Sequence, residues 1–279
     1  MGSLKQLLTS NTLGPGEVFS GRLEEFIQMI TKQQFLKIAG LAILTIGSSS
    51  LFAASGAAAG NAPAPSADGA SVVGKVKFTG QLPQPAKVSM NADPSCAKLH
   101  PGPAVSQDFL TGSDNSLGNV IVFISDGLGN RSFDVPTEAV TFEQKGCEYA
   151  PHVVAVRANQ KLKMVNSDNT THNIHPLPAN NREWNKAEPA GSTMEESFPR
   201  EEIAIPVKCN VHPWMKSYVA VFKHPYFAVT GKDGSFQLPN LPPGDYTVEA
   251  WHEKLGTMTQ KITITAGQTR SLDFTFKAH

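Results

Sequence analysis

The chain has few cysteines and few charged residues. Its 279 residues include only three cysteines, which is too few for a disulfide framework and allows one bridge with one thiol left over. Charged side chains make up 17% of the chain, and 24 basic residues balance 24 acidic ones, so nucleic acid is not indicated as the main partner. With 23 glycines and 20 prolines available for turns, this composition suits an all-β protein better than a helical one.

The apolar run near the N-terminus, from Ile38 to Gly47, is shorter than the roughly 20 residues that a membrane span needs. A basic residue precedes the run and small residues follow it, as in a secretory signal peptide. Residues 1–56 are therefore predicted to be an N-terminal extension with a signal helix, which a start at Met29 would shorten. An uncleaved membrane anchor through residues 38–59 is the alternative. In both cases we expect the protein in the periplasm or cell envelope, either soluble after cleavage or tethered by this segment.

Beyond a linker at 57–70, the sequence consists of short β-type runs separated by turn signals. Several runs alternate between apolar and polar residues, and in the last one Leu272, Phe274 and Phe276 share a face. Short strands at this spacing are typical of sandwiches and barrels, so the predicted fold class is all-β. The runs lie at 71–78, 118–125, 138–144, 152–158, 161–166, 202–209, 217–222, 234–239, 245–252, 258–265 and 270–277.

Three residues with metal-binding side chains, Cys209, His212 and Met215, lie at steps of three in the stretch PVKCNVHPWMKS. Copper that carries electrons needs a site suited to both Cu(I) and Cu(II), and a thiolate, two imidazoles and a weakly bound thioether meet that need. A second histidine, His172, stands in a turn after the β-run at 161–166. Zinc is the main alternative for such a set, although zinc sites seldom recruit methionine.

The two stretches NSDNTTHNIH (166–175) and CNVHPWM (209–215) together resemble the cupredoxins, and the amicyanin-like and plastocyanin-like type 1 blue copper proteins in particular. The resemblance implies a Greek-key sandwich over about 135–224 that holds one type 1-like copper ion. It also implies the residue roles. His172, Cys209 and His212 would be the equatorial ligands, Met215 the axial ligand, and Asn173 the residue that links the two ligand loops by hydrogen bonds.

One departure from the cupredoxin pattern lies just before the cysteine. The family often has an aromatic residue there, where this chain has Val207 and Lys208. A lysine suits a solvent-facing position, so the packing beside Cys209 is expected to differ from that of the family.

Other kinds of metal site find less support. The sequence has no C-x-x-C-H motif for haem, and the ligand loop has no second cysteine for a binuclear copper centre. A multicopper oxidase would need a second such domain and further histidine clusters, so we expect no enzymatic activity. We expect His100 not to form a second metal site, although it lies four residues after a cysteine. His175, His224 and His252 are expected to form hydrogen bonds or pack.

The C-terminal stretch VTGKDGSFQLPNLPPGDYTVEAWHEKLG contains a D-G turn and an L-P-P-G turn, each next to an alternating strand. This pattern resembles the carboxypeptidase regulatory-like, or transthyretin-like, β-sandwich. We assign it to residues 225–279. The family's opening strand resembles the run at 71–78, so we interpret 71–134 as the first half of a split sandwich with the copper domain inserted.

The two remaining cysteines, Cys96 and Cys147, have two interpretations once Cys209 is assigned to copper by resemblance. In an oxidising compartment they would form a disulfide that fastens the loop at 81–110 to the start of the copper domain. The alternative is two unrelated buried thiols.

The expected function is that of a mononuclear copper protein that exchanges single electrons with a redox partner in the cell envelope, such as a c-type cytochrome or a membrane electron-transfer complex. The resemblance implies that the ring edge of His212 reaches the surface through an apolar docking patch of Pro176, Leu177, Pro213 and Trp214. A copper carrier or storage module, and a structural or binding protein with a stabilising metal site, are the alternatives.

Overall fold

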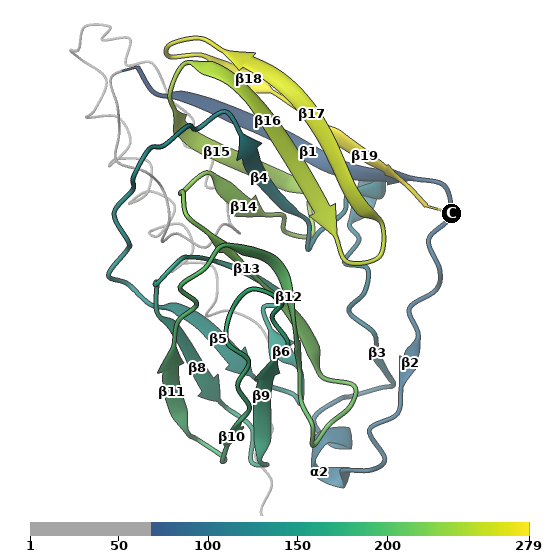
Figure 1. Ribbon diagram of the computed structural model, residues 1–279. Coiled ribbons are helices and arrows are strands. Elements are labelled where there is room, and N and C mark those ends of the chain that lie inside the picture. The colour runs from purple at the N-terminus through teal and green to yellow at the C-terminus, as the bar shows by residue number, and fades with distance from the viewer. Residues whose placement is uncertain (1–67, 279) are drawn as a thin grey trace, which may run out of the picture. The chain divides into compact units, whose positions relative to one another are not determined.

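The computed structural model describes residues 68–278. The predicted signal or anchor helix, the Met29 start and most of the predicted linker lie outside these residues. No helix in the described part of the chain is long and apolar enough to cross a membrane. The described part is nearly all β, which confirms the predicted fold class (Figure 1).

Strands from both ends of the described chain form one β-sandwich, which we call the terminal sandwich. One sheet has the order β15-β1-β18, with β19 also pairing with β1, and the other has the order β14-β4-β16-β17. Its strands are β1 (Ala70–Thr79), β4 (Ile121–Asp126), β14 (Phe227–Val229), β15 (Ser235–Leu241), β16 (Gly244–His252), β17 (Gly256–Ile264), β18 (Thr269–Ser271) and β19 (Phe274–Lys277). β1 and β4 thus join strands that follow them by more than 100 residues, the pairing that a split sandwich requires.

The chain between β4 and β14 forms a second sandwich, which we call the central sandwich. Its sheets have the orders β10-β9-β12-β13-β7 and β11-β8-β5-β6. The strands are β5 (Val140–Gln144), β6 (Tyr149–Ala150), β7 (Val153–Arg157), β8 (Leu162–Asn166), β9 (His172–Pro176), β10 (Lys186–Glu188), β11 (Thr193–Glu196), β12 (Glu202–Lys208) and β13 (Lys216–Phe222). β10 and β11 have no counterpart among the predicted runs.

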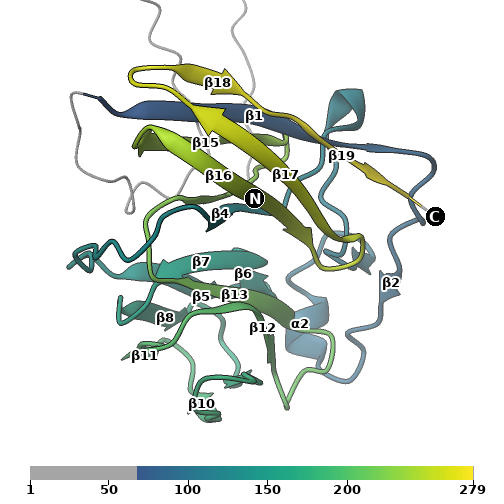
Figure 2. The ribbon, with the colours of Figure 1, turned by 45° about the horizontal axis from the view of Figure 1, so that its top comes forward.

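Each sandwich encloses an apolar core of its own, and side-chain alternation decides which residues enter it. In β19, Phe274 and Phe276 are buried and Thr275 is exposed, and Leu272 just before the strand is buried too, as the alternation predicts. A third cluster, which includes Phe123, Ala155 and Phe222, joins β4 and β14 to β7 and β13. Figure 2 shows β4 facing β7 and β13 across this apolar seam.

The segment between β1 and β4 leaves the terminal sandwich and packs against the central one. It contains the short strands β2 (Lys87–Val88) and β3 (Ala104–Val105), the one-turn helix α2 (Pro94–Ala97) and the 3₁₀ turn η1 (Ser113–Asn115). α2 begins at an Asp93 cap that accepts the Ser95 N–H, with proline at the first helical position. Both views place α2 beside the connection from β12 to β13 (Figures 1 and 2). This segment therefore meets the loop that carries the predicted ligands.

Candidate metal centre

The two predicted ligand loops lie next to each other because their strands pair. His172 is the first residue of β9, which pairs with β12 through Val207 opposite Pro176 and Lys208 opposite His175. Cys209 follows β12 directly. The strand alternates strictly at this point, so Val207 and Cys209 are buried while Lys208 faces solvent.

A tight loop returns the chain from Cys209 to β13. The Met215 N–H donates to the His212 carbonyl at 3.0 Å, and the Cys209 N–H donates to the Met215 carbonyl at 3.3 Å. The His212 N–H donates to the Cys209 sulfur at 3.3 Å, which holds the sulfur on the inner side of the loop. Met215 is buried in the same apolar cluster as Cys209.

His172, Cys209 and His212 offer one nitrogen or sulfur atom each within 4.8 Å of one another. The two Nδ1 atoms are 2.9 Å apart, and the Cys209 Sγ is 3.9 Å from the Nδ1 of His212. All three residues are at least 98% buried. The structure thus brings together the three predicted equatorial residues, with both Nδ1 atoms directed inward.

The outer nitrogen of each imidazole is bonded to a carboxylate. The Nε2 of His172 lies 2.9 Å from Asp168 Oδ2, and the Nε2 of His212 lies 2.9 Å from Asp93 Oδ2. Both Asp168 oxygens also accept backbone N–H groups, from Gly146 and Cys147 at 2.7 Å each. Hydrogen bonds from Ser95 and from His212 hold the pKa of Asp93 well below its ordinary range, so this group is an ionised acceptor.

These carboxylates determine where the imidazole lone pairs lie. Because each Nε2 donates its hydrogen to an aspartate, each Nδ1 of a neutral imidazole carries a lone pair. Two lone pairs that face each other at 2.9 Å repel unless a proton or a metal cation lies between them. Burial lowers the pKa of His172, which disfavours the proton. With the Cys209 sulfur alongside, the donor set fits a thiophilic cation such as copper or zinc.

Asn173 forms hydrogen bonds that connect the two predicted ligand loops. Its Oδ1 accepts from the Asn210 N–H at 2.6 Å, from the Val211 N–H at 3.3 Å and from the Cys209 thiol at 3.3 Å. Its Nδ2 donates to Asn185 Oδ1 at 2.6 Å, and its carbonyl accepts the Tyr149 hydroxyl at 2.5 Å.

The structure joins Cys96 of α2 to Cys147, 51 positions later in sequence, in a disulfide. The Cys96 sulfur lies 3.7 Å from the Nε2 of His212. The disulfide therefore attaches α2 directly beside His212. At its other end, the Cys147 N–H donates to Asp168, the carboxylate that bonds His172.

The surface around His212 differs from the expectation that its ring edge is exposed. Asp93 and Cys96 cover the ring, which is 2% exposed. In the predicted docking patch, Leu177 and Pro213 are exposed, Trp214 is half-buried and Pro176 is buried. Trp214 packs on His212 with ring centroids 5.0 Å apart.

Within residues 68–278, the other histidines form hydrogen bonds or pack, and none of them joins Cys209 in a group that could hold a metal. His175 bonds Asn210 and Glu183, and His100 bonds the Gly146 carbonyl at 2.8 Å. His224 and His252 are buried, and each accepts the backbone N–H of the residue two positions later.

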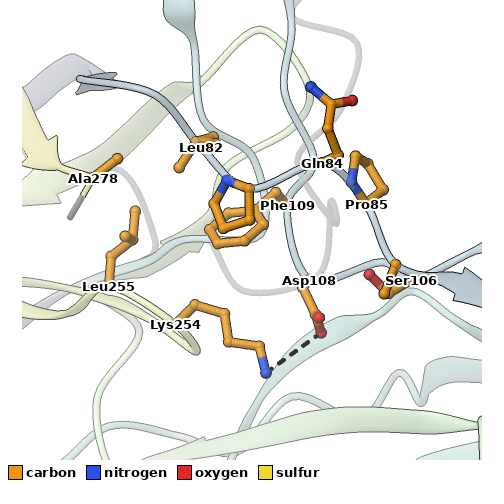
Figure 3. A pocket seen from close by; sticks show the side chains of 11 residues that line it. Leu82, Gln84, Pro85, Ser106, Asp108, Phe109, Lys254, Leu255 and Ala278 are labelled. Carbon is orange, nitrogen blue, oxygen red and sulfur yellow. Dashed lines mark ion pairs between the residues drawn. The ribbon is translucent and has the colours of Figure 1, made fainter.

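A separate hollow of about 340 Å³ lies between the segment that joins β1 to β4 and the turn from β16 to β17 (Figure 3). Its walls are mostly apolar, and an ion pair between Asp108 and Lys254 at 3.7 Å crosses one side. None of the predicted metal ligands lines it.

Sequence reasoning missed Asp93 and Asp168. Asp168 lies four residues before His172 within the quoted motif, so its place in the ligand turn was a usable signal. The stretch Asp93-Pro94-Ser95 is a helix-start signal, but it gives no indication of contact with a residue 119 positions away.

Residues 217–277 match the family model of the carboxypeptidase regulatory-like domain. The match begins in β13, one strand earlier than the predicted boundary at 225. A comparison with curated proteins finds none that matches.

Several solved structures are similar to part of the chain. An oxidised mutant of amicyanin is 14% identical, with a TM-score of 0.28, over 36% of this chain and 97% of that one. A purple cupredoxin from Nitrosopumilus maritimus is 20% identical, with a TM-score of 0.26, over 29% and 98%. A copper-containing nitrite reductase from Thermus scotoductus SA-01 is 18% identical, with a TM-score of 0.29, over 34% of this chain. The chain spans 24% of that reductase.

Proposed function

We propose that the central sandwich is a cupredoxin-like domain that binds one copper ion and exchanges single electrons with a redox partner. The observation that carries this proposal is the pair of imidazole Nδ1 atoms facing each other at 2.9 Å beside a buried cysteine sulfur, with both Nε2 atoms bonded to carboxylates. His172, Cys209 and His212 would hold the ion, with Met215 as the weak fourth ligand. Bound copper would supply a one-electron Cu(II)/Cu(I) couple.

The chain's own residues make the site rigid. Asn173 fixes the start of the ligand loop, backbone hydrogen bonds close the loop at Met215, and the disulfide holds α2 against His212. A rigid donor set changes little between two oxidation states, which favours electron exchange over storage. Burial of all three donors keeps water from the thiolate.

We propose that the terminal sandwich is a scaffold that holds the copper domain in the cell envelope, because its fold carries no chemistry by itself. The partner would be a c-type cytochrome or a membrane electron-transfer complex. Its docking place would include Trp214, which touches His212 and, unlike His212, reaches the surface.

The test is a Cu(II) titration followed by visible absorption and voltammetry. We expect one equivalent of copper, an intense thiolate-to-copper band and a fast reversible couple. His172→Gln should abolish the band, and His175→Gln, which changes the next histidine of β9, should leave it intact.

Two results would contradict the proposal. Equal Cu(II) titrations for His172→Gln and His175→Gln would show that His172 is not a copper ligand. Tight Cu(I) binding without a reversible couple would instead indicate a copper carrier.

A further inference from the structure

The two carboxylates at the metal centre come from different parts of the chain. Asp168 lies in the same turn as His172. Asp93 belongs to the segment between β1 and β4, outside the central sandwich, and reaches His212 across 119 positions of sequence. A cupredoxin-like domain alone would therefore lack the residue that holds the outer nitrogen of His212.

Four contacts fix Asp93 in place. Its Oδ1 accepts the Ser95 N–H at 2.9 Å and the Ser95 hydroxyl at 2.5 Å, and its Oδ2 accepts the Thr170 hydroxyl at 3.2 Å and the His212 imidazole. The first two contacts are those of a helix N-cap, so the carboxylate is positioned by α2 itself. The disulfide at Cys96 then anchors α2. The carboxylate is thus held before any metal binds.

A carboxylate on the outer nitrogen of a ligating imidazole has two effects on a metal. It fixes the tautomer and the ring orientation, and it makes the imidazole more electron-donating. The added negative charge favours the more highly charged oxidation state.

We propose that Asp93 is a positioning residue of the copper site, which keeps the His212 Nδ1 directed at the Cys209 sulfur and favours Cu(II) over Cu(I). This inference rests on the proposed function. It assigns to the segment between β1 and β4 a direct role in setting the reduction potential.

The variant Asp93→Asn tests this proposal with little structural change. Asparagine is as good an N-cap as aspartate, so its one oxygen keeps the contact with Ser95. Its amide NH2 then takes the place of the oxygen that faces His212, so the variant removes both the charge and the acceptor at His212. Asp114→Asn is the matched control, because Asp114 is an exposed carboxylate in η1 of the same segment that pairs with Lys77 at 3.3 Å, and it is not among the groups that contact the candidate site.

We expect Asp93→Asn to weaken Cu(II) binding by about 10-fold or more. Cu(I) binding should change less. If the ratio of the two affinities falls about 10-fold, the reduction potential rises by about 59 mV. Competition with a chelator and voltammetry measure these two quantities, and Asp114→Asn should match the wild type in both.

A second measurement uses metal-free protein. The His212 Nε2–H should give a slowly exchanging imidazole signal in the NMR spectrum, and Asp93→Ala should abolish it, whereas Asp114→Ala should not. Persistence of the signal in Asp93→Ala would overturn the positioning role.

The outcomes separate this inference from the proposed function. If the wild type forms the thiolate band and Asp93→Asn matches Asp114→Asn in affinity and potential, the inference fails and the function stands. If the wild type binds no copper, the function fails and so does the assignment of Asp93 to a copper site.

Discussion

The side chain of Asn173 is predicted to contribute about 2–3 kcal/mol to the stability of the metal-free protein. Asn173→Ala removes the acceptor of the Asn210 N–H and the donor to Asn185, both at 2.6 Å, and each such bond is worth about 1 kcal/mol net. It also removes two longer contacts, to Val211 and Cys209 at 3.3 Å, and empties a position that is 5% exposed.

Urea unfolding of the copper-free protein, followed by tryptophan fluorescence, measures this loss. The control is Asn210→Ala in the same loop, because Asn210 is exposed and its side chain makes one bond, to His175 at 3.1 Å, so the change should cost no more than about 0.5 kcal/mol. In the copper-loaded protein, Asn173→Ala should also weaken Cu(II) binding by about 10–100-fold. Equal unfolding midpoints for the two alanine variants would refute the role given to Asn173.

Two further predictions concern the stability of the fold. The disulfide joins cysteines that are 51 positions apart in sequence, so replacing both Cys96 and Cys147 with serine should cost about 4 kcal/mol in urea unfolding. A loss below about 1 kcal/mol would contradict this. Burial lowers the pKa of His224 and of His252 to about 4, below the 6.5 of the unfolded chain, so stability should fall as pH drops from about 6.5 to about 4, by about 3 kcal/mol per histidine. His252→Asn keeps an acceptor for the Lys254 N–H and should remove the part of the pH dependence that His252 contributes. An unchanged dependence of stability on pH in this variant would contradict the prediction.

Local pattern was enough to single out residues that the structure brings together, because their positions follow from strand geometry. Alternation along β12 places Cys209 inside and Lys208 outside, and the spacing of His212 and Met215 fits one tight turn. The pairing of β9 with β12 then brings His172 to the same place. These relations involve neighbouring strands, whose alternation and turns are visible in the sequence.

The burial of the His212 ring by Asp93 and Cys96 depends on contacts between segments that are distant in sequence. The helix-start signal at Asp93 specifies a cap but leaves open what else the carboxylate touches. The contact with His212 forms only because the segment between β1 and β4 packs against the central sandwich. No local sequence pattern encodes that packing. For the same reason, the expectation of an exposed His212 ring did not include the residues that bury it.

The central claim is that Cys209 and two histidines bind copper as a single site, and the optical spectrum of the copper-loaded protein tests it most directly. We predict an intense visible band for the wild type with one equivalent of Cu(II), and loss of that band in Cys209→Ser, with unfolding of the metal-free variant close to that of the wild type. A wild type without the band, or a band that survives in Cys209→Ser, would contradict the account.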